Sequence, residues 1–139
     1  MGIATEIITN PLVLSPLAAI LFNNLIKVII YSLKHAKLKL DYLYKGYGGM
    51  PSGHSAFLGA LLAAIFVEQG LSSSFYITIS ISILLIYNLT SVKWFFSKES
   101  EVFEQLFKIH KKDKKEIEFP GRLVGHTLLE IIIGLIIGI

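Results

Sequence analysis

The sequence predicts an all-α integral membrane protein, a helical bundle with about four transmembrane helices that forms a single domain over residues 1–139. Two observations lead to this fold class. Hydrophobic residues make up 53% of the chain and charged residues only 17%, whereas soluble domains carry about a quarter charged residues. Long apolar segments also alternate with short polar ones along the whole chain. The chain has no cysteine, which excludes disulfides and thiolate metal sites.

Four apolar segments are the candidate membrane helices, at residues 11–33, 52–67, 75–96 and 120–139. Crossing the hydrocarbon core takes about 20 apolar residues, so the first, third and fourth segments are long enough and the second is slightly short. The stretch 77–83 alternates isoleucine with polar residues, as a half-buried strand does. A lone strand in lipid would leave its backbone groups unpaired, so we expect a helix there.

Nearly all basic residues lie in or beside the two loops that follow the first and third segments, and they predict the topology. They are Lys34, Lys37, Lys39 and Lys45, then Lys93, Lys98, Lys108, Lys111, Lys112, Lys114, Lys115 and Arg122. The N-terminal tail and the connection at 69–74 contain no lysine or arginine. By the positive-inside rule both basic loops are cytoplasmic and both termini lie on the opposite side of the membrane.

The second basic loop has a pattern of its own. Apolar residues recur at helical spacing within 101–110, which predicts an amphipathic helix lying in the headgroup region. The lysine run at 111–115 suits anionic lipid. Nothing besides charge points to nucleic acid, so we expect the bilayer, and no nucleic acid, as a partner.

The stretch 48–56, Gly-Gly-Met-Pro-Ser-Gly-His-Ser-Ala, is a turn of small residues leading into the second apolar segment. It brings Ser52, Gly53 and His54 to the start of a helix. Free backbone N–H groups, a hydroxyl and a titratable imidazole at a helix N-terminus suit a phosphate group.

The fourth segment carries a second set of polar residues. Arg122, His126, Glu130, Gly134 and Gly138 recur every fourth residue, so they would share one helix face. Glu130 could accept a hydrogen bond from one ring nitrogen of His126 and leave the other nitrogen free as a nucleophile. The two glycines would let another helix approach closely, which is also compatible with a homodimer.

Lys27 lies inside the first segment, where a charge costs roughly 2.5–3.5 kcal/mol at the membrane centre and so usually faces an anion, a carboxylate or water. It could instead extend to the interface or form an ion pair with Glu130. Polar residues gather at the cytoplasmic ends of all four segments, and this convergence predicts a site. A zinc site is disfavoured, because no second carboxylate or further histidine accompanies His54, His126 and Glu130.

These motifs resemble the superfamily of type 2 phosphatidic acid phosphatases and vanadium haloperoxidases, whose Pro-Ser-Gly-His signature matches residues 51–54. Within it the chain looks like the small divergent membrane branch, which pairs the 48–56 turn with a late Gly-His-Thr-x-x-Glu, here residues 125–130. Lys27 matches the N-terminal lysine of that branch. In the middle motif Asn88, Lys93 and Trp94 stand where the branch has an aspartate and an arginine pair, and lysine lacks the bidentate phosphate geometry of arginine.

The resemblance implies a metal-independent phosphatase, without a cofactor, that hydrolyses a lipid phosphate or diphosphate of the phosphatidate or prenyl phosphate type through a phosphohistidine. His126 would attack phosphorus, Glu130 would orient it, and His54 would protonate the leaving alcohol. The residues implied to bind the phosphate are Lys27, Ser52, Gly53, Arg122 and Lys93. The weakened middle motif leaves an alternative, a non-catalytic membrane protein that uses the same pocket to bind anionic lipid or a partner.

Overall fold

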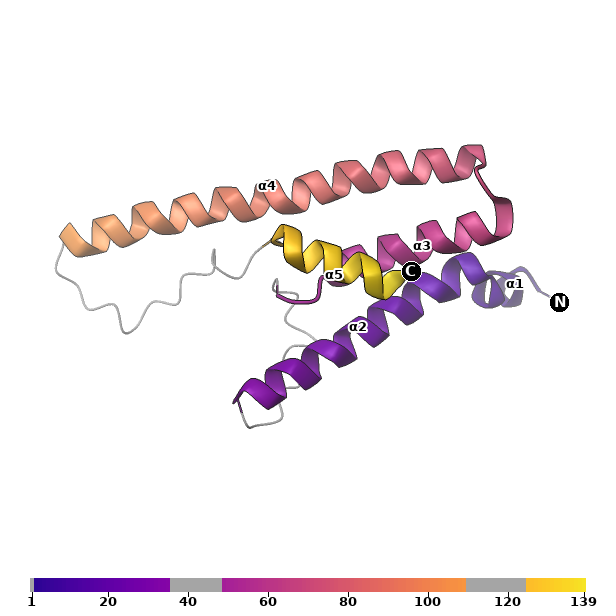
Figure 1. Cartoon of the computed structure of the whole chain (residues 1–139), viewed down its shortest axis with the longest axis horizontal. Helices are drawn as coiled ribbons and strands as arrows, with labels where there is room; N and C mark the ends of the chain where they lie inside the picture. The colour runs from indigo at the N-terminus through magenta and orange to yellow at the C-terminus, as the bar shows by residue number, and fades with distance from the viewer. Residues whose placement is uncertain (1, 36–48, 110–124) are drawn as a thin grey trace.

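The structure is a computed structural model that describes residues 2–35, 49–109 and 125–139 (Figure 1). Within these ranges helices are the regular elements and no strand occurs, so the all-α fold is confirmed. The helices are α1 (Ile3–Thr9), α2 (Pro11–His35), α3 (Gly53–Gln69), α4 (Ser73–Ile109) and α5 (Leu128–Gly138).

The helices are apolar enough for a membrane. α2 and α4 are each long and apolar enough to cross a bilayer, while α3 and α5 are shorter apolar helices. Large hydrophobic side chains cover their outer faces, among them Leu21, Val67 and Ile83, which are 70%, 83% and 63% exposed. An apolar surface of this extent needs lipid to cover it, which fits the predicted helical membrane bundle.

α4 joins two predicted elements into one helix. The expected membrane segment at 75–96 and residues 101–109 of the expected amphipathic helix (101–110) belong to this one helix of 37 residues, and residue 110 lies outside the described residues. No glycine or proline interrupts this stretch, so nothing stops the backbone from continuing where the sequence becomes charged. The alternating stretch at 77–83 is helical, as expected in lipid.

α5 begins later than predicted. The expected start at Pro120 lies outside the described residues, and residues 125–127 are not helical. Gly125 has a left-handed φ of +79°, and Thr127 is the N-cap of α5. His126 therefore precedes the helix instead of sharing a helical face with Glu130.

α3 is the central helix, packing most extensively against α2 and α5 and less against α4 (Figure 1). The α3–α5 interface requires glycine, the residue without a side chain, at three positions. A Cβ on Gly134 would overlap the Ser52 carbonyl oxygen, one on Gly138 would overlap that of Ala56, and one on Gly59 would lie 2.8 Å from the Leu135 carbonyl oxygen. The predicted close approach is thus made to α3 of the same chain, and a homodimer, which stays a prediction, would need another surface.

Candidate active site

The turn before α3 is anchored to two other helices. Ser52 is fully buried and caps α3, its Oγ accepting hydrogen bonds from the backbone N (3.4 Å) and the Oγ (3.0 Å) of Ser55. Asn23 of α2 donates its Nδ2 to the Pro51 carbonyl at 3.2 Å, and the Ser52 backbone N donates to the Glu130 carbonyl of α5 at 3.1 Å. The start of α3 is thereby fixed next to the start of α5.

A capping box holds the Glu130 carboxylate in place. The Thr127 Oγ1 accepts from the Glu130 backbone N at 3.4 Å, and the Glu130 Oε2 accepts from the Thr127 backbone N at 2.9 Å. The same Oε2 lies 3.3 Å from Nδ1 of His126. The predicted contact between Glu130 and His126 is therefore present, but the cap of the helix creates it, rather than a shared helical face.

The backbone of His126 is docked on α4. Its N–H donates to the Leu89 carbonyl at 3.3 Å. At the neighbouring Gly125 a Cβ would lie 2.6 Å from the backbone N of Lys93 and 2.8 Å from its Cα. Both the left-handed backbone and the contact with α4 therefore require glycine at 125.

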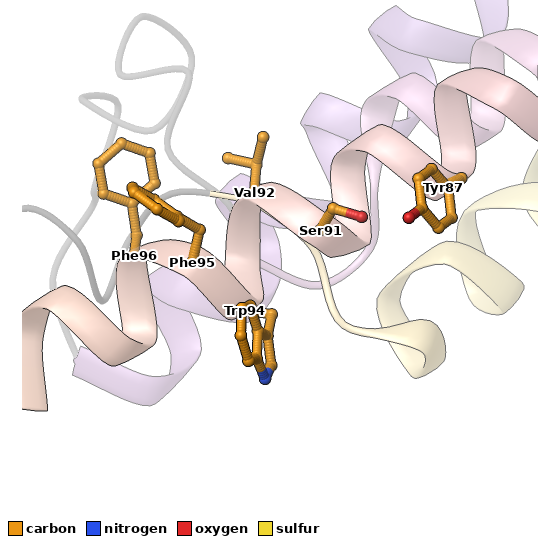
Figure 2. A pocket seen from close by; sticks show the side chains of 6 residues that line it. All are labelled: Tyr87, Ser91, Val92, Trp94, Phe95 and Phe96. Carbon is orange, nitrogen blue, oxygen red and sulfur yellow. The ribbon is translucent and has the colours of Figure 1, made fainter.

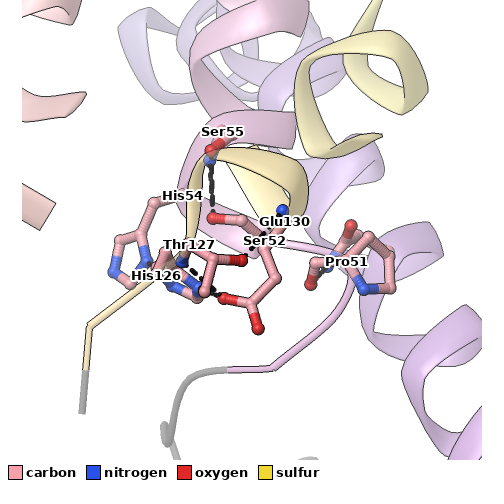
Figure 3. A network of polar contacts seen from close by, with 8 residues as sticks. Pro51, Ser52, His54, Ser55, His126, Thr127 and Glu130 are labelled. Atoms are coloured by element: carbon pink, nitrogen blue, oxygen red, sulfur yellow. Dashed lines mark hydrogen bonds and ion pairs between the residues drawn. The ribbon is translucent and has the colours of Figure 1, made fainter. Parts of the chain in front are cut away.

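The two histidines meet directly, although 72 residues separate them (Figure 3). Nδ1 of His54 lies 3.2 Å from Nε2 of His126, and the rings pack edge to face with centroids 5.4 Å apart. His126 is only 4% exposed, whereas His54 is exposed. Because a hydrogen bond needs one donor and one acceptor, only one of these two nitrogens carries a proton in this contact.

Lys27 supplies positive charge to this cluster. It is buried in α2 at 9% exposure and lies within electrostatic reach of Glu130, His54 and His126. Burial lowers the pKa of the His126 imidazole below its usual value of 6.5, and the neighbouring His54 and Lys27 lower it further, against the opposing effect of Glu130. The lowered pKa favours the uncharged imidazole of His126, which has one lone pair.

The structure brings together most of the residues that the sequence singled out. Lys27, Ser52, His54, His126 and Glu130 belong to one cluster, with Gly53 in the first turn of α3 beside Ser52. Lys93 reaches the edge of this cluster through its backbone, at the contact with Gly125, and Arg122 lies outside the described residues. Their roles toward a phosphate stay predictions.

Four further residues shape the site, and the sequence analysis assigned none of them a role, although two of them belong to the matched motif at 125–130. They are Asn23, Leu89, Gly125 and Thr127. The Thr-x-x-Glu pattern ahead of an apolar run is a readable capping-box signal, so Thr127 could have been found. The contacts of Leu89 and Gly125 depend on how α4 packs, which no local pattern reveals.

A pocket of about 460 Å³ lies along α4, on the stretch of the helix that also contains Leu89 (Figure 2). Among the described residues α4 alone lines it, through Tyr87, Ser91, Val92, Trp94, Phe95 and Phe96. Most of these side chains are apolar or aromatic. The pocket lies on the same stretch of α4 as Leu89 and Lys93, which contact His126 and Gly125.

Comparisons with known proteins agree with this picture. A family model described as "Divergent PAP2 family" matches residues 8–139. An "Uncharacterized membrane protein YuiD" of Bacillus subtilis (strain 168) is 33% identical over 147 residues, covering 96% of this chain and 92% of that protein. No solved structure gives a significant match. The chain is therefore a membrane-protein homologue that belongs to the Divergent PAP2 family.

Proposed function

We propose that the protein is a metal-independent phosphatase that hydrolyses a lipid phosphate or diphosphate through a phosphohistidine on His126. The observation that carries this proposal is the chain of contacts from His54 through His126 to Glu130, beside the buried ammonium of Lys27. It combines a nucleophile, an orienting carboxylate, an acid and a cation. Membership of a phosphatase-related family supports the same chemistry.

The reaction would proceed in two steps. Nε2 of His126 attacks phosphorus, the bond from phosphorus to the leaving oxygen breaks, and His54 gives that oxygen a proton. Water then attacks the phosphohistidine, His54 takes up a proton from it, and the phosphorus–nitrogen bond breaks to release phosphate. Lys27 and the first N–H groups of α3 would stabilise the charge on the phosphoryl oxygens.

A lipid phosphate suits the surroundings of the cluster. The pocket along α4 offers apolar and aromatic side chains such as Trp94 and Phe95 next to the point where His126 meets Leu89. An acyl or prenyl chain could lie against that wall while its phosphate reaches His126. The lysine distribution supports a site facing the cytoplasmic leaflet, so single cysteines at Ser73 and Lys112 should label from opposite sides of the membrane.

The test is phosphate release by the purified protein in detergent, without added metal, from phosphatidate and from prenyl mono- and diphosphates. Turnover should disappear in His126→Ala and fall by about 10²–10⁴-fold in His54→Ala, the usual contribution of general acid–base catalysis. His35→Ala, at the end of α2, is the matched control and should retain turnover. An acid-labile ³²P label should form on the wild type and be absent from His126→Ala. Full turnover by His126→Ala would refute the mechanism.

A second candidate is a non-catalytic protein that binds anionic lipid in the same pocket. The observation in its favour is the near-complete burial of His126 beneath His54. Binding of phosphatidate without hydrolysis of any phosphoester, lost in a Lys27→Ala variant, would favour this reading. Hydrolysis that depends on both histidines would exclude it.

A further inference from the structure

The proposed nucleophile is not free in this structure. His126 is 4% exposed, and its Nε2, the nitrogen that faces away from Glu130, contacts Nδ1 of His54 at 3.2 Å. His54 itself is exposed and so lies on the outer side of the pair. The group expected to act as acid therefore covers the group expected to attack.

The hydrogen-bond partners decide which nitrogen carries the proton. The Glu130 Oε2 accepts a hydrogen bond from the Thr127 backbone N at 2.9 Å and lies 3.3 Å from Nδ1 of His126. Nδ1 of His126 therefore donates to it, which leaves the lone pair of a neutral His126 on Nε2. A lone pair can only accept, so Nδ1 of His54 must be the donor.

From this we infer that the resting site is self-capped: the Nδ1–H of His54 occupies the lone pair of His126 Nε2, and an anion reaches that nitrogen only by displacing His54. The inference rests on the proposed function, because it assigns that same site its mode of regulation. Reacting atoms approach to about 3–3.5 Å before attack, so two nitrogens 3.2 Å apart leave no room for phosphorus between them.

The part that moves is His54. His126 is held on three sides, by Glu130 at its Nδ1, by Leu89 at its backbone N, and by the packing of Gly125 on α4. His54 is exposed in the first turn of α3, and among the residues that the structure describes its ring has a hydrogen-bond partner and a ring contact only in His126. Lys27 gives an incoming anion the attraction that can compensate the lost hydrogen bond.

The cap can be tested without any substrate. Diethyl pyrocarbonate reacts with unprotonated imidazole nitrogen, so its rate at His126, followed by mass spectrometry of the full-length protein in detergent, reports how free Nε2 is. His54→Phe keeps a flat ring but removes the donor, and it should raise this rate roughly 2- to 12-fold, the range that the net strength of one hydrogen bond gives. His54→Asn keeps an N–H donor close to the position of Nδ1 and should stay near the wild-type rate.

The opposite order, a slow His54→Phe and a fast His54→Asn, would show that mere bulk covers His126 and would overturn the inference. Equal rates in all three proteins would also overturn it. Thermal melting of each variant identifies any that has lost its fold, and such a variant is replaced by His54→Leu or His54→Gln respectively.

Displacement needs a second measurement, with inorganic phosphate as the probe. In protein labelled with ¹⁵N-histidine, a scalar coupling across the His54–His126 hydrogen bond should be present at rest and vanish as phosphate binds. Persistence of the coupling in phosphate-saturated protein would overturn displacement. Absence of phosphate binding to wild type and variants alike would count against the proposed function instead, while the reactivity measurement still decides the cap.

Discussion

Replacing Gly125 by alanine should separate His126, the proposed nucleophile, from α4. Gly125 has a φ of +79°, and a Cβ there would lie 2.6 Å from the backbone N of Lys93 and 2.8 Å from its Cα. Backbone atoms of a long helix cannot turn aside as a side chain can. The segment that carries His126 must therefore retreat from α4.

The size of the effect follows from the geometry. An alanine in the left-handed region costs roughly 1–2 kcal/mol. Relieving the contact from 2.6 Å to an ordinary 3.4 Å requires a shift of about 0.8 Å, which would stretch the 3.3 Å hydrogen bond from His126 to Leu89 beyond bonding distance. Losing that bond adds about 0.5–1.5 kcal/mol. We expect a total destabilisation of about 1.5–3.5 kcal/mol. Since a displacement near 1 Å can cost about 10²-fold in rate, we also expect a loss of kcat of that order.

The matched control is Gly70→Ala. Gly70 also has a positive φ, +62°, but a Cβ there would meet no heavy atom within 4 Å. Gly70→Ala should therefore lose stability through backbone strain alone and keep kcat within about twofold, as expected away from a site. Thermal melting in detergent and phosphate release on the best substrate measure the two effects. If Gly125→Ala matched Gly70→Ala in both, the docking of His126 on α4 would have no importance for the site.

Three further predictions concern the same region. Gly134→Ala should lower the melting temperature by the equivalent of about 1–3 kcal/mol, because the new Cβ would overlap the Ser52 carbonyl oxygen. Its control, Gly2→Ala, should leave the melting temperature unchanged, because the nearest atom to a Cβ there is Thr5 Oγ1 at 4.0 Å. Thr127→Val should cost about 1 kcal/mol of stability and lower kcat more than it changes KM, because it removes the N-cap hydroxyl. Thr127→Ser keeps that hydroxyl and should retain both stability and kcat. Equal losses in the two variants would argue against the capping box as the device that positions Glu130. In a pH profile, kcat/KM should fall on the acidic side with an apparent pKa below 6.5, because His126 must be unprotonated to attack and its pKa is lowered. Glu130→Gln should move the apparent pKa of this acidic limb to a still lower pH, since Glu130 raises the pKa of His126. A shift of this apparent pKa to higher pH would contradict that reasoning.

The sequence predicts α2 and α3 almost to the residue, because strong signals limit both helices. Pro11 opens α2, and Ser52 and Gly70 cap the two ends of α3. α4 differs from its prediction for a physical reason. The charges after residue 96 indicate where the chain leaves an apolar environment, and this says nothing about where a helix ends.

The site could be predicted as a set of residues but not as a geometry. Convergence of polar residues at one end of each segment correctly brought Lys27, His54 and His126 together. The hydrogen bond between the two histidines depends on tertiary packing across 72 residues, which spacing cannot supply. The late start of α5 was missed because the left-handed backbone of Gly125 and its close approach to Lys93 appear only in the folded chain.

The docking of His126 on Leu89 also sets the depth of the site in the bilayer. Leu89 is sixteen residues beyond Ser73, the first residue of α4, and a rise of 1.5 Å per residue puts it about 24 Å along the helix. If α4 crosses a hydrocarbon core about 30 Å thick with the polar connection before Ser73 at one surface, His126, the proposed nucleophile, would lie close to the other surface. α4 would then hold His126 near the level of the lipid headgroups, where the phosphate of the proposed lipid substrate could reach it with little displacement along the membrane normal.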